Sequence, residues 1–412
     1  MAQISFERLK RRLRELARFG ALGGGGVTRP AWSPQYEEAR AWLVGEIKAA
    51  GLDAWVDPAG NVFGATDISA FADDRPAVLT GSHIDTVPEG GTLDGALGVI
   101  AGLECLHAIV EQRLPHARPL AVAAWIDEEG RYGSLFGSRA FCGLLDTAKV
   151  PELAAVDGER LVDVMTRAGF DPARVGEARV NRAAVSSYVE LHIEQGPRLE
   201  EAGVPIGVVE AIVGIRRTRL TFVGQADHAG TTPMERRRDG FLAAAEYSIK
   251  ARDLVVKKSG GRAVTNVGVV RVHPGVSNIV PARGEIIHEM RAPDPGMLER
   301  LWKDCRALAR RVARRRGVTV DVVPQSATSP AACAPRVQAA VADAARDAGL
   351  ATTTLYSAAG HDAQNLATMT EAGMLFIPSS GGRSHRIDEW SAPEAIERGA
   401  NVLLGTLLRL SA

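Results

Sequence analysis

Residues 77–80 read A-V-L-T and residues 120–126 read L-A-V-A-A-W-I, two short apolar stretches separated by a helical pattern over residues 95–110. Nearly continuous apolar strands are typical of a sheet whose two faces are both covered by helices. The same α/β patterning returns late in the chain, with a helix expected at 336–348, a strand at 374–378 and a last helix at 393–410. We therefore predict an α/β fold with a central mixed sheet.

The stretch between residues 216 and 323 follows another pattern. Its apolar and polar residues predict strand, helix, strand, strand, helix and strand, which is the order of a ferredoxin-like α+β domain. Because α/β patterning resumes afterwards, this domain is predicted to be an insertion. The predicted boundaries are 1–214 and 327–412 for the discontinuous larger domain, and 215–326 for the inserted one.

Composition narrows the class of protein. Hydrophobic residues make up 46% and charged residues 24% of the 412 residues, as in ordinary folded proteins. Lys and Arg equal Asp and Glu at 49 each, so no overall field attracts nucleic acid or an anionic membrane. The four scattered cysteines and the charged N-terminus, which lacks an apolar signal segment, fit a cytoplasmic protein. We expect neither a nucleic-acid nor a membrane partner.

Metal-binding side chains follow the predicted strands. His83 and Asp94 come after the A-V-L-T strand, and Glu128 and Glu129 follow the L-A-V-A-A-W-I strand. Carboxyl ends of strands are where ligands gather in open α/β sheets, and His192 in Y-V-E-L-H-I-E-Q-G-P is expected at the same edge. Imidazole and carboxylate without thiolate suit zinc, manganese and related divalent ions, and a carboxylate can bridge two of them.

Each of these residues also has an ordinary structural explanation. A Glu-Glu pair is usually a solvated acidic turn, and an isolated histidine is usually a hydrogen-bonded structural residue. The E-R-R-R-D run at 235–239 is more typical of local salt bridges at a helix start than of a basic patch. Four further histidines are interpreted as packing or solvated residues: His107, His116, His273 and His288. The combination of residues, not any single one, indicates a site.

Seven motifs in fixed order carry a family resemblance. They are G-S-H-I-D-T-V-P (81–88), L-D-G-A-L-G-V (93–99), D-E-E-G-R-Y-G (127–133), L-H-I-E-Q-G-P (191–197), D-H-A-G-T-T-P-M-E-R-R-R-D (227–239), A-G-H-D-A (359–363) and G-R-S-H-R-I-D-E (382–389). Over nearly its whole length the chain resembles the metal-dependent amidohydrolases that include N-carbamoyl-L-amino-acid hydrolase, allantoate amidohydrolase and yeast-type β-alanine synthase.

The resemblance implies two metal ions in each subunit. One is expected at His83 and His192 and the other at Glu129 and His385, with Asp94 bridging them. Zinc is the expected metal, with manganese, cobalt or nickel as alternatives. The same resemblance makes Glu128 the general acid and base and Asp85 the carboxylate that orients the His83 ring. Because the wider superfamily usually has a carboxylate at position 192, His192 points to the carbamoyl branch.

The inserted domain resembles a lid through which such proteins form homodimers. His228 would reach a neighbouring subunit's site and polarise the substrate carbonyl. Asn278 and Arg291 match the residues that bind the substrate carboxylate, and Gln195 would contact its amide end. His361 and Asp362 match the family's H-D pair, but we assign them no chemical step.

The expected reaction is hydrolysis of the carbamoyl C–N bond of an N-carbamoyl amino acid or a related ureido acid such as allantoate. An aminoacylase or metallopeptidase is the enzymatic alternative, and a non-catalytic metal-binding scaffold is the alternative from another class. Two stretches depart from the family pattern: Y-S-A-A-G before His361, and G-I-R-R at 214–217 in place of G-I-R-W or G-L-R-W. Both departures concern substrate specificity.

Overall fold

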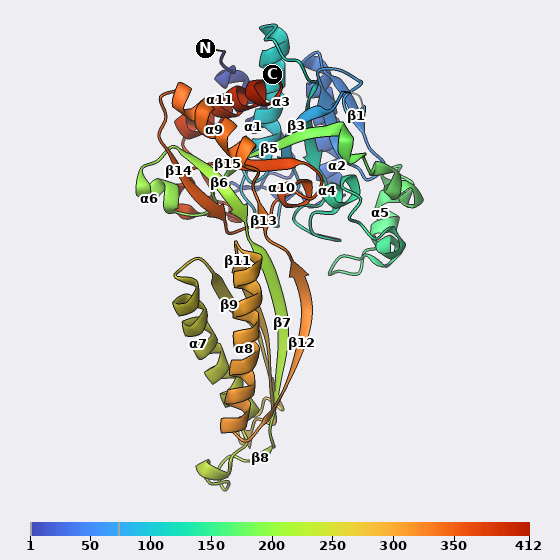
Figure 1. Cartoon of the computed structure of the whole chain (residues 1–412). Coiled ribbons are helices and arrows are strands. Elements are labelled where there is room, and N and C mark those ends of the chain that lie inside the picture. Colours follow the sequence, from blue (N-terminus) through green and yellow to red (C-terminus); the bar gives the residue numbers. More distant parts are fainter. Residues whose placement is uncertain (1, 73–74) are drawn as a thin grey trace. The chain divides into compact units, whose positions relative to one another are not determined.

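The computed structural model describes residues 2–72 and 75–412. Its contacts divide the chain into two compact units. Unit 1 comprises residues 1–210, 332–355 and 361–412, and unit 2 comprises residues 211–331 and 356–360. Figure 1 shows helices and strands mixed in unit 1, and two long helices beside a sheet in unit 2.

Unit 1 is built on a mixed sheet of nine strands in the order β1-β2-β4-β3-β5-β15-β6-β13, with β14 pairing with β6. Strands β4, β3, β5 and β15 are parallel to one another, and antiparallel pairs join β1 to β2, β2 to β4 and β6 to β15. The strands are β1 (Asp53–Val56), β2 (Val62–Ala65), β3 (Ala77–His83), β4 (Leu120–Trp125), β5 (Val185–Ile193), β6 (Ile206–Ile212), β13 (Ala331–Ala332), β14 (Thr352–Ser357) and β15 (Glu371–Ile377). The predicted central mixed sheet is confirmed.

Helices bury the apolar strands of this sheet. Strands β3 and β4 are buried along their whole lengths. Apolar residues begin β3 and make up all of β4, as expected for strands covered on both faces. The helices of unit 1 are α1 (Phe6–Leu16), α2 (Pro34–Ala49), α3 (Ala96–Glu111), α4 (Phe136–Phe141), α5 (Leu161–Arg167), α6 (Arg198–Ala202), α9 (Pro335–Asp347), α10 (Ala363–Leu366) and α11 (Pro393–Leu410). Side chains from α2, α3, α9 and α11 form one continuous core with the strands.

Local chemistry explains where key helices begin. The Ser33 hydroxyl accepts a hydrogen bond from the Tyr36 amide, and Pro34 occupies the first turn of α2. Helix α3 begins after Gly95, whose φ of 64° lies in the left-handed region. A Cβ atom at Gly95 would lie 2.4 Å from the His83 ring, so only glycine fits there. The start of α3 is thus fixed against the end of β3.

Unit 2 has the predicted strand and helix order. Strands β7 (Gly214–Val223), β9 (Val264–His273), β11 (Arg283–Ala292) and β12 (Thr319–Thr328) form an antiparallel sheet in the order β12-β7-β11-β9, and the helices are α7 (Gly240–Ser259) and α8 (Pro295–Arg315). Both helices contribute to one separate apolar core. A small ribbon of β8 (Asp227–His228) and β10 (Ile279–Val280) completes the unit. Its role as a lid and dimerisation domain stays a prediction.

Two observations bear on the predicted cytoplasmic location. Within residues 2–72 and 75–412, no helix combines the length and apolar character needed to span a bilayer. The four cysteines are free thiols, and Cys105, Cys305 and Cys333 are buried. A cytoplasmic location stays a prediction from the sequence.

Candidate metal centre

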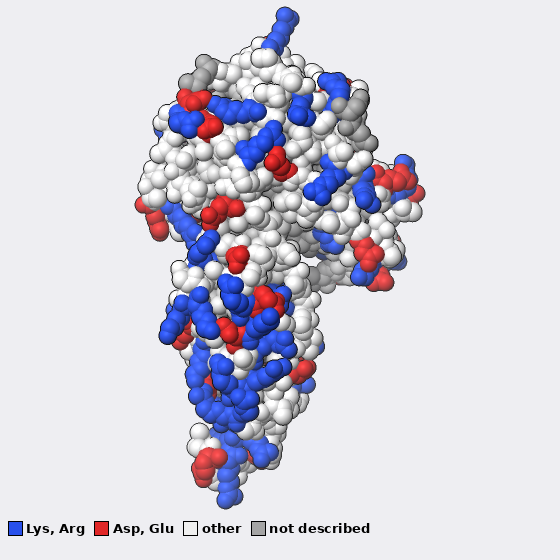
Figure 2. All heavy atoms as spheres, viewed as in Figure 1, with Lys and Arg blue, Asp and Glu red and all other residues white. Residues whose placement is uncertain are grey.

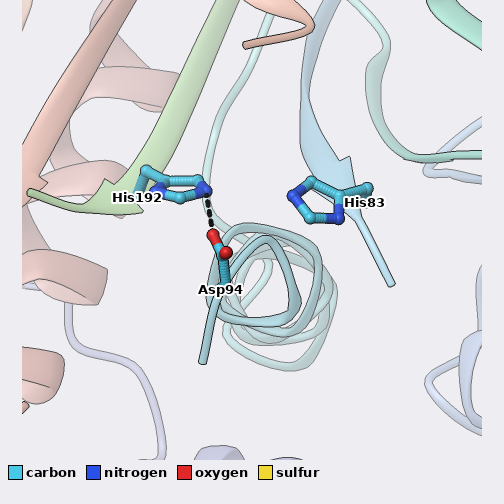
Figure 3. A group of neighbouring side chains, drawn as sticks. All are labelled: His83, Asp94 and His192. Carbon is cyan, nitrogen blue, oxygen red and sulfur yellow. Dashed lines mark ion pairs between the residues drawn. The ribbon is translucent and has the colours of Figure 1, made fainter. Parts of the chain in front are cut away.

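Two neighbouring parallel strands of the unit 1 sheet each carry a histidine at or near the carboxyl end. His83 is the last residue of β3, and His192 lies near the end of the neighbouring strand β5. Asp94 lies just before α3, and Figure 3 shows its carboxylate beside the His192 ring, with His83 on its other side. All three side chains are buried, and each offers a ligand atom within 4.8 Å of the others.

A second group of ligand atoms shares Asp94 with the first. Asp94, Glu129 and His385 also offer ligand atoms within 4.8 Å of one another. One Asp94 oxygen lies 3.2 Å from Nε2 of His192, and the other lies 3.1 Å from Nε2 of His385. A carboxylate whose two oxygens face two different histidines has the geometry of a bridging ligand. The structure therefore brings together all five predicted metal ligands.

Hydrogen bonds orient the two buried rings as metal ligands. Nδ1 of His83 lies 2.9 Å from the backbone oxygen of Asp85, and Nδ1 of His192 lies 2.8 Å from that of Ile193. A carbonyl oxygen only accepts, so each Nδ1 carries the proton. Nε2 of each ring is then directed at the shared centre, which is the arrangement found around metal-bound histidines.

Electrostatics within the cluster favour a bound cation. Burial opposes ionisation of Asp94, but hydrogen bonds from His192 and His385 hold the pKa of this carboxyl well below its usual value. The pKa of Glu129 is raised to about 8 by burial and by the Asp94 charge. Burial and the neighbouring Glu129 raise the pKa of Glu128 well above its usual value. One buried Glu129 oxygen has no hydrogen-bond partner among the described residues. Divalent cations would offset these crowded negative charges, so the donor set fits them.

Glu128 also lies at this centre, but it faces a different histidine from the one that Glu129 faces. Its carboxylate is 3.7 Å from Nε2 of His83, while Glu129 faces His385 at 3.7 Å. The two adjacent side chains therefore point to different parts of the cluster, as expected for successive residues at a strand end. The predicted roles of Glu129 in metal binding and of Glu128 in proton transfer stay predictions.

Asp85 acts through different atoms from those predicted. Its carboxylate lies 3.8 Å from Nδ1 of His83, beyond hydrogen-bonding distance, and the ring is held by the Asp85 backbone carbonyl instead. The carboxylate accepts hydrogen bonds from the backbone amides of Glu128 and Glu129, at 3.4 and 3.2 Å. Through these two hydrogen bonds, the Asp85 side chain orients the backbone of Glu128 and Glu129. The His83 ring contacts the backbone oxygen of Asp85 instead, which is the nearer acceptor.

Glu389 lies at the site, and no role was predicted for it from the sequence. One of its oxygens accepts from the backbone amide of Asp94 at 3.0 Å, and the other accepts from the Ser384 hydroxyl at 2.8 Å and the His385 amide at 3.3 Å. A single buried carboxylate thus holds the segments that carry the bridging aspartate and a ligand histidine. Its position in the G-R-S-H-R-I-D-E motif was the only sequence signal.

Glu190 is a second buried carboxylate with no role predicted from the sequence, and it contacts the segments that carry the histidines. Glu190 is fully buried and accepts hydrogen bonds from the Ser82 hydroxyl at 2.7 Å and the Ala363 amide at 3.0 Å. Ser82 precedes His83, and Ala363 follows the H-D pair. The His361 ring packs edge-on against His192, with centroids 4.6 Å apart, and Asp362 accepts a 2.5 Å hydrogen bond from Ser138. The H-D pair is therefore part of the wall of the centre.

Gln195 contacts the cluster directly. Its side-chain nitrogen lies 3.0 Å from Asp94 and 3.2 Å from the Ser384 hydroxyl. Its backbone has a φ of 58°, and Asp127 and His385 share this left-handed conformation. Strained non-glycine residues of this kind gather at functional sites. The predicted contact of Gln195 with the substrate amide stays untested.

The three site residues predicted in unit 2 do not form one group. His228 and Asn278 are neighbours in the β8–β10 ribbon, where the Ala229 amide donates to the Asn278 carbonyl at 3.0 Å. Nδ1 of the exposed His228 accepts from the amides of Gly230 and Thr231, so its proton lies on Nε2. Figure 1 shows β8 at one end of unit 2. Both residues therefore present their polar groups at that end.

Arg291 lies at the other end of the unit 2 sheet. Arg283 pairs with Val223, next to the ribbon, whereas Arg291 pairs with Ile215 at the far end of β11. Eight residues of extended strand separate these positions by roughly 27 Å. A small carboxylate cannot contact both Arg291 and Asn278 of the same chain. Their predicted roles in binding the substrate carboxylate stay predictions.

Comparisons with known proteins agree with this centre. Residues 79–409 match the model of the peptidase family M20/M25/M40. The chain belongs to this family. It is 37% identical to an N-carbamoyl-L-amino acid amidohydrolase of Geobacillus stearothermophilus, over 99% of both chains. It is 32% identical to an allantoate amidohydrolase of Bacillus subtilis, over 96% of this chain and 95% of that one.

A solved structure extends the similarity to the fold. An amidase of the hydantoinase/carbamoylase family from Burkholderia multivorans superposes with a TM-score of 0.90 and 33% identity, covering 100% of this chain and 98% of that one. The resemblance predicted from seven motifs is confirmed. In this M20/M25/M40 family member, two of the four groups of described residues that could hold a metal ion share Asp94, and the other two are His83 with Glu128 and Glu129, and Glu190 with His192 and His361.

Proposed function

We propose that this protein hydrolyses the carbamoyl C–N bond of an N-carbamoyl amino acid or a related ureido acid such as allantoate. The observation that carries the proposal is the pair of ligand groups sharing Asp94, with Glu128 beside them. Relatives named N-carbamoyl-L-amino acid amidohydrolase and allantoate amidohydrolase support the choice of bond. The products would be an amino acid or ureido product, ammonia and carbon dioxide.

Two divalent cations, with zinc as our first choice, would lower the pKa of a bound water and polarise the substrate carbonyl. His83 and His192 would hold one cation, Glu129 and His385 the other, and Asp94 both. Glu128 would take a proton from the attacking water and return it to the departing ammonia. The remaining carbamate loses carbon dioxide, so the overall reaction consumes one water.

His228 and Asn278 would act on the site of a second copy of the chain. Their separation from Arg291 along unit 2 supports this assignment, since one subunit cannot bring all three to a small substrate. The Nε2–H of His228 would donate to the carbonyl oxygen as negative charge develops. Arg291 would bind the substrate carboxylate through its planar guanidinium, and Gln195 would contact the ureido group.

An exposed apolar surface supports a homodimer through unit 2. Leu242, Ile249 and Val256 recur every seven residues on α7 and have exposed fractions of 39, 64 and 54%. Strand β9 is at the edge of its sheet and exposes Val270 on the face that carries the helices. Apolar surface and an unpaired strand edge together are typical of a protein interface. We propose this surface as the dimer contact.

A substrate comparison tests the reaction. The metal-loaded protein would be assayed with matched N-carbamoyl and N-acetyl amino acids and with allantoate, measuring both ammonia and free amino acid. Ureido hydrolysis releases both products from the carbamoyl compounds, whereas an aminoacylase releases amino acid without ammonia from the acetyl compounds. Hydrolysis of the acetyl series alone would replace our proposal with the aminoacylase alternative. Inactivity on every compound, with metal bound, would favour a non-catalytic scaffold.

A further inference from the structure

One face of the unit 2 sheet carries a cluster of arginines. On β7, Thr218 faces α8, because Trp302 Nε1 donates to its hydroxyl at 3.3 Å. On β11, His288 faces α7 through a 2.8 Å hydrogen bond with the Tyr247 hydroxyl. Successive residues of a strand point to opposite faces. The face away from both helices therefore carries Arg217, Arg219, Glu289 and Arg291, which we call the arginine face.

Glu289 joins two of these arginines. It lies directly opposite Arg217 in the β7–β11 register. One of its oxygens is 2.6 Å from Nε of Arg217, and the other is 2.8 Å from Nε of Arg291. Because the carboxylate engages each guanidinium at Nε, it fixes both groups while their outer nitrogens stay available as donors. Nη1 of Arg291 donates to the Ala358 carbonyl at 3.0 Å.

The arginine face has an excess of positive charge. Arg217 is about half exposed, at 48%, and in the described part of the chain no acceptor contacts its outer nitrogens. Arg219, two residues along the same face, has no carboxylate partner within residues 2–72 and 75–412. Over the whole face, strand register places five arginines against three carboxylates, Glu285, Glu289 and Asp321, so the net charge is +2. One substrate carboxylate on Arg291 would neutralise this charge only in part.

The surrounding unit is also cationic. Residues 211–331 and 356–360 contain 22 Lys and Arg against 11 Asp and Glu, so unit 2 carries +11 and the rest of the chain, with 27 against 38, carries −11. Figure 2 shows that Lys and Arg also gather over the visible helices of unit 2. The neutral composition of the chain thus hides a unit that attracts anions.

We propose that Arg217 and Arg219 form a second anion-binding subsite beside Arg291 and select ureido acids with a second carboxylate, such as N-carbamoyl-aspartate or N-carbamoyl-glutamate. This inference rests on the proposed function, because it extends the site around Arg291.

Matched substrates test the subsite. N-carbamoyl-L-aspartate and N-carbamoyl-L-asparagine have nearly the same shape and differ in one negative charge, as do the corresponding glutamate and glutamine compounds. For the zinc-reconstituted protein we expect kcat/KM to be about tenfold or more higher for the acidic member of at least one pair, since a charge-assisted hydrogen bond is worth such a factor. The ratio should fall as salt is added, because Arg217 is half exposed.

Variants assign the preference to the arginine face. Arg217→Met should bring the acidic-to-amide ratio close to one, mainly through KM, and Arg217→Lys should restore part of it. Arg271→Met is the control, because Arg271 forms a similar cross-strand pair with Glu285 at 2.7 Å but lies on β9 toward the other end of the sheet. The control should keep the wild-type ratio.

The outcomes separate this inference from the proposed reaction. A preference for the amide substrates in the wild type, or an unchanged ratio in Arg217→Met, would overturn the second subsite and leave ureido hydrolysis standing. A loss of the ratio in Arg271→Met as well would show that general charge attraction, and not Arg217, causes it. If no ureido acid is hydrolysed at all, the proposed function itself fails.

Discussion

The two units hold their site residues in contrasting ways. In unit 1, His83, Asp94 and His192 are buried, and backbone carbonyls and carboxylates behind them fix their orientation. In unit 2, His228 and Asn278 are exposed in a two-residue ribbon at one end of the unit. Ligands that must hold an ion need a rigid surrounding, whereas residues that meet a substrate or a second subunit must stay accessible. Under the proposed function, unit 1 would supply the metal chemistry and unit 2 the residues that bind the substrate.

The largest effect is expected from the proton-transfer residue of unit 1. Glu128→Gln keeps the shape of the side chain but cannot take up a proton, so kcat should fall about a thousandfold. Metal content measured by mass spectrometry should stay at the wild-type level, because Glu129 and not Glu128 is the proposed ligand. Turnover close to the wild type would remove Glu128 from the mechanism.

Mixing two inactive proteins tests whether the ribbon of unit 2 serves a second subunit. If His228 acts in trans, dimers formed from Glu128→Gln and His228→Ala chains contain one site with Glu128 intact and a partner's His228. Random exchange would then restore about a quarter of the wild-type activity in a two-fold symmetric dimer. Absence of any recovery, with mixed dimers verified by native mass spectrometry, would mean that His228 acts within its own chain or not at all.

The anchoring role of Glu389 predicts a smaller effect, on metal affinity. Glu389→Gln replaces one accepting oxygen with a donor, so it cannot accept from both the Asp94 segment and the His385 segment. Metal affinity should fall about 10- to 100-fold in a competition titration.

Glu104→Gln is the control for this prediction. Glu104 is an equally buried carboxylate, but it pairs with Arg8 and Arg12, away from the cluster. This variant should lower the free energy of unfolding and leave metal affinity unchanged. Equal metal affinities for Glu389→Gln and the wild type would show that the centre does not depend on this anchor.

The smallest predicted effect concerns the stability of unit 2. Burial lowers the pKa of His288 to about 4, below the value of 6.5 in the unfolded chain. As the pH falls, the unfolded state therefore binds a proton at His288 before the folded state does. The contribution of neutral His288 to the free energy of unfolding is complete above about pH 6.5 and is lost as the pH falls toward 4. The loss amounts to about 3 kcal/mol.

Urea unfolding of the wild type and His288→Gln from about pH 7.5 to about pH 4.5 would measure this effect. Glutamine does not titrate but can still hydrogen-bond to Tyr247 and Thr265, which both contact the histidine. The variant should lose less stability than the wild type as the pH falls. Parallel pH curves would show that His288 is not the titrating group.

Sequence patterns predicted those parts of the structure that depend on local chemistry. The apolar runs at 77–80 and 120–126 became β3 and β4, and the last helix has the predicted bounds. The five predicted metal ligands lie together in the structure, and motif order and strand ends both point to these residues. The short strands β1, β2 and β14 were not predicted, since four to six residues give little periodicity.

What the sequence determined by itself was the set of residue types and the order of strands and helices, because both follow from local periodicity and from motifs. Only the tertiary structure decided which atoms meet: the backbone oxygen of Asp85 on His83, Glu389 between Asp94 and His385, and Arg217 paired with Glu289. It also separated Arg291 from Asn278 by the length of a strand. Such contacts join residues far apart in the chain, and their distances are set by packing and strand register, which no local pattern encodes.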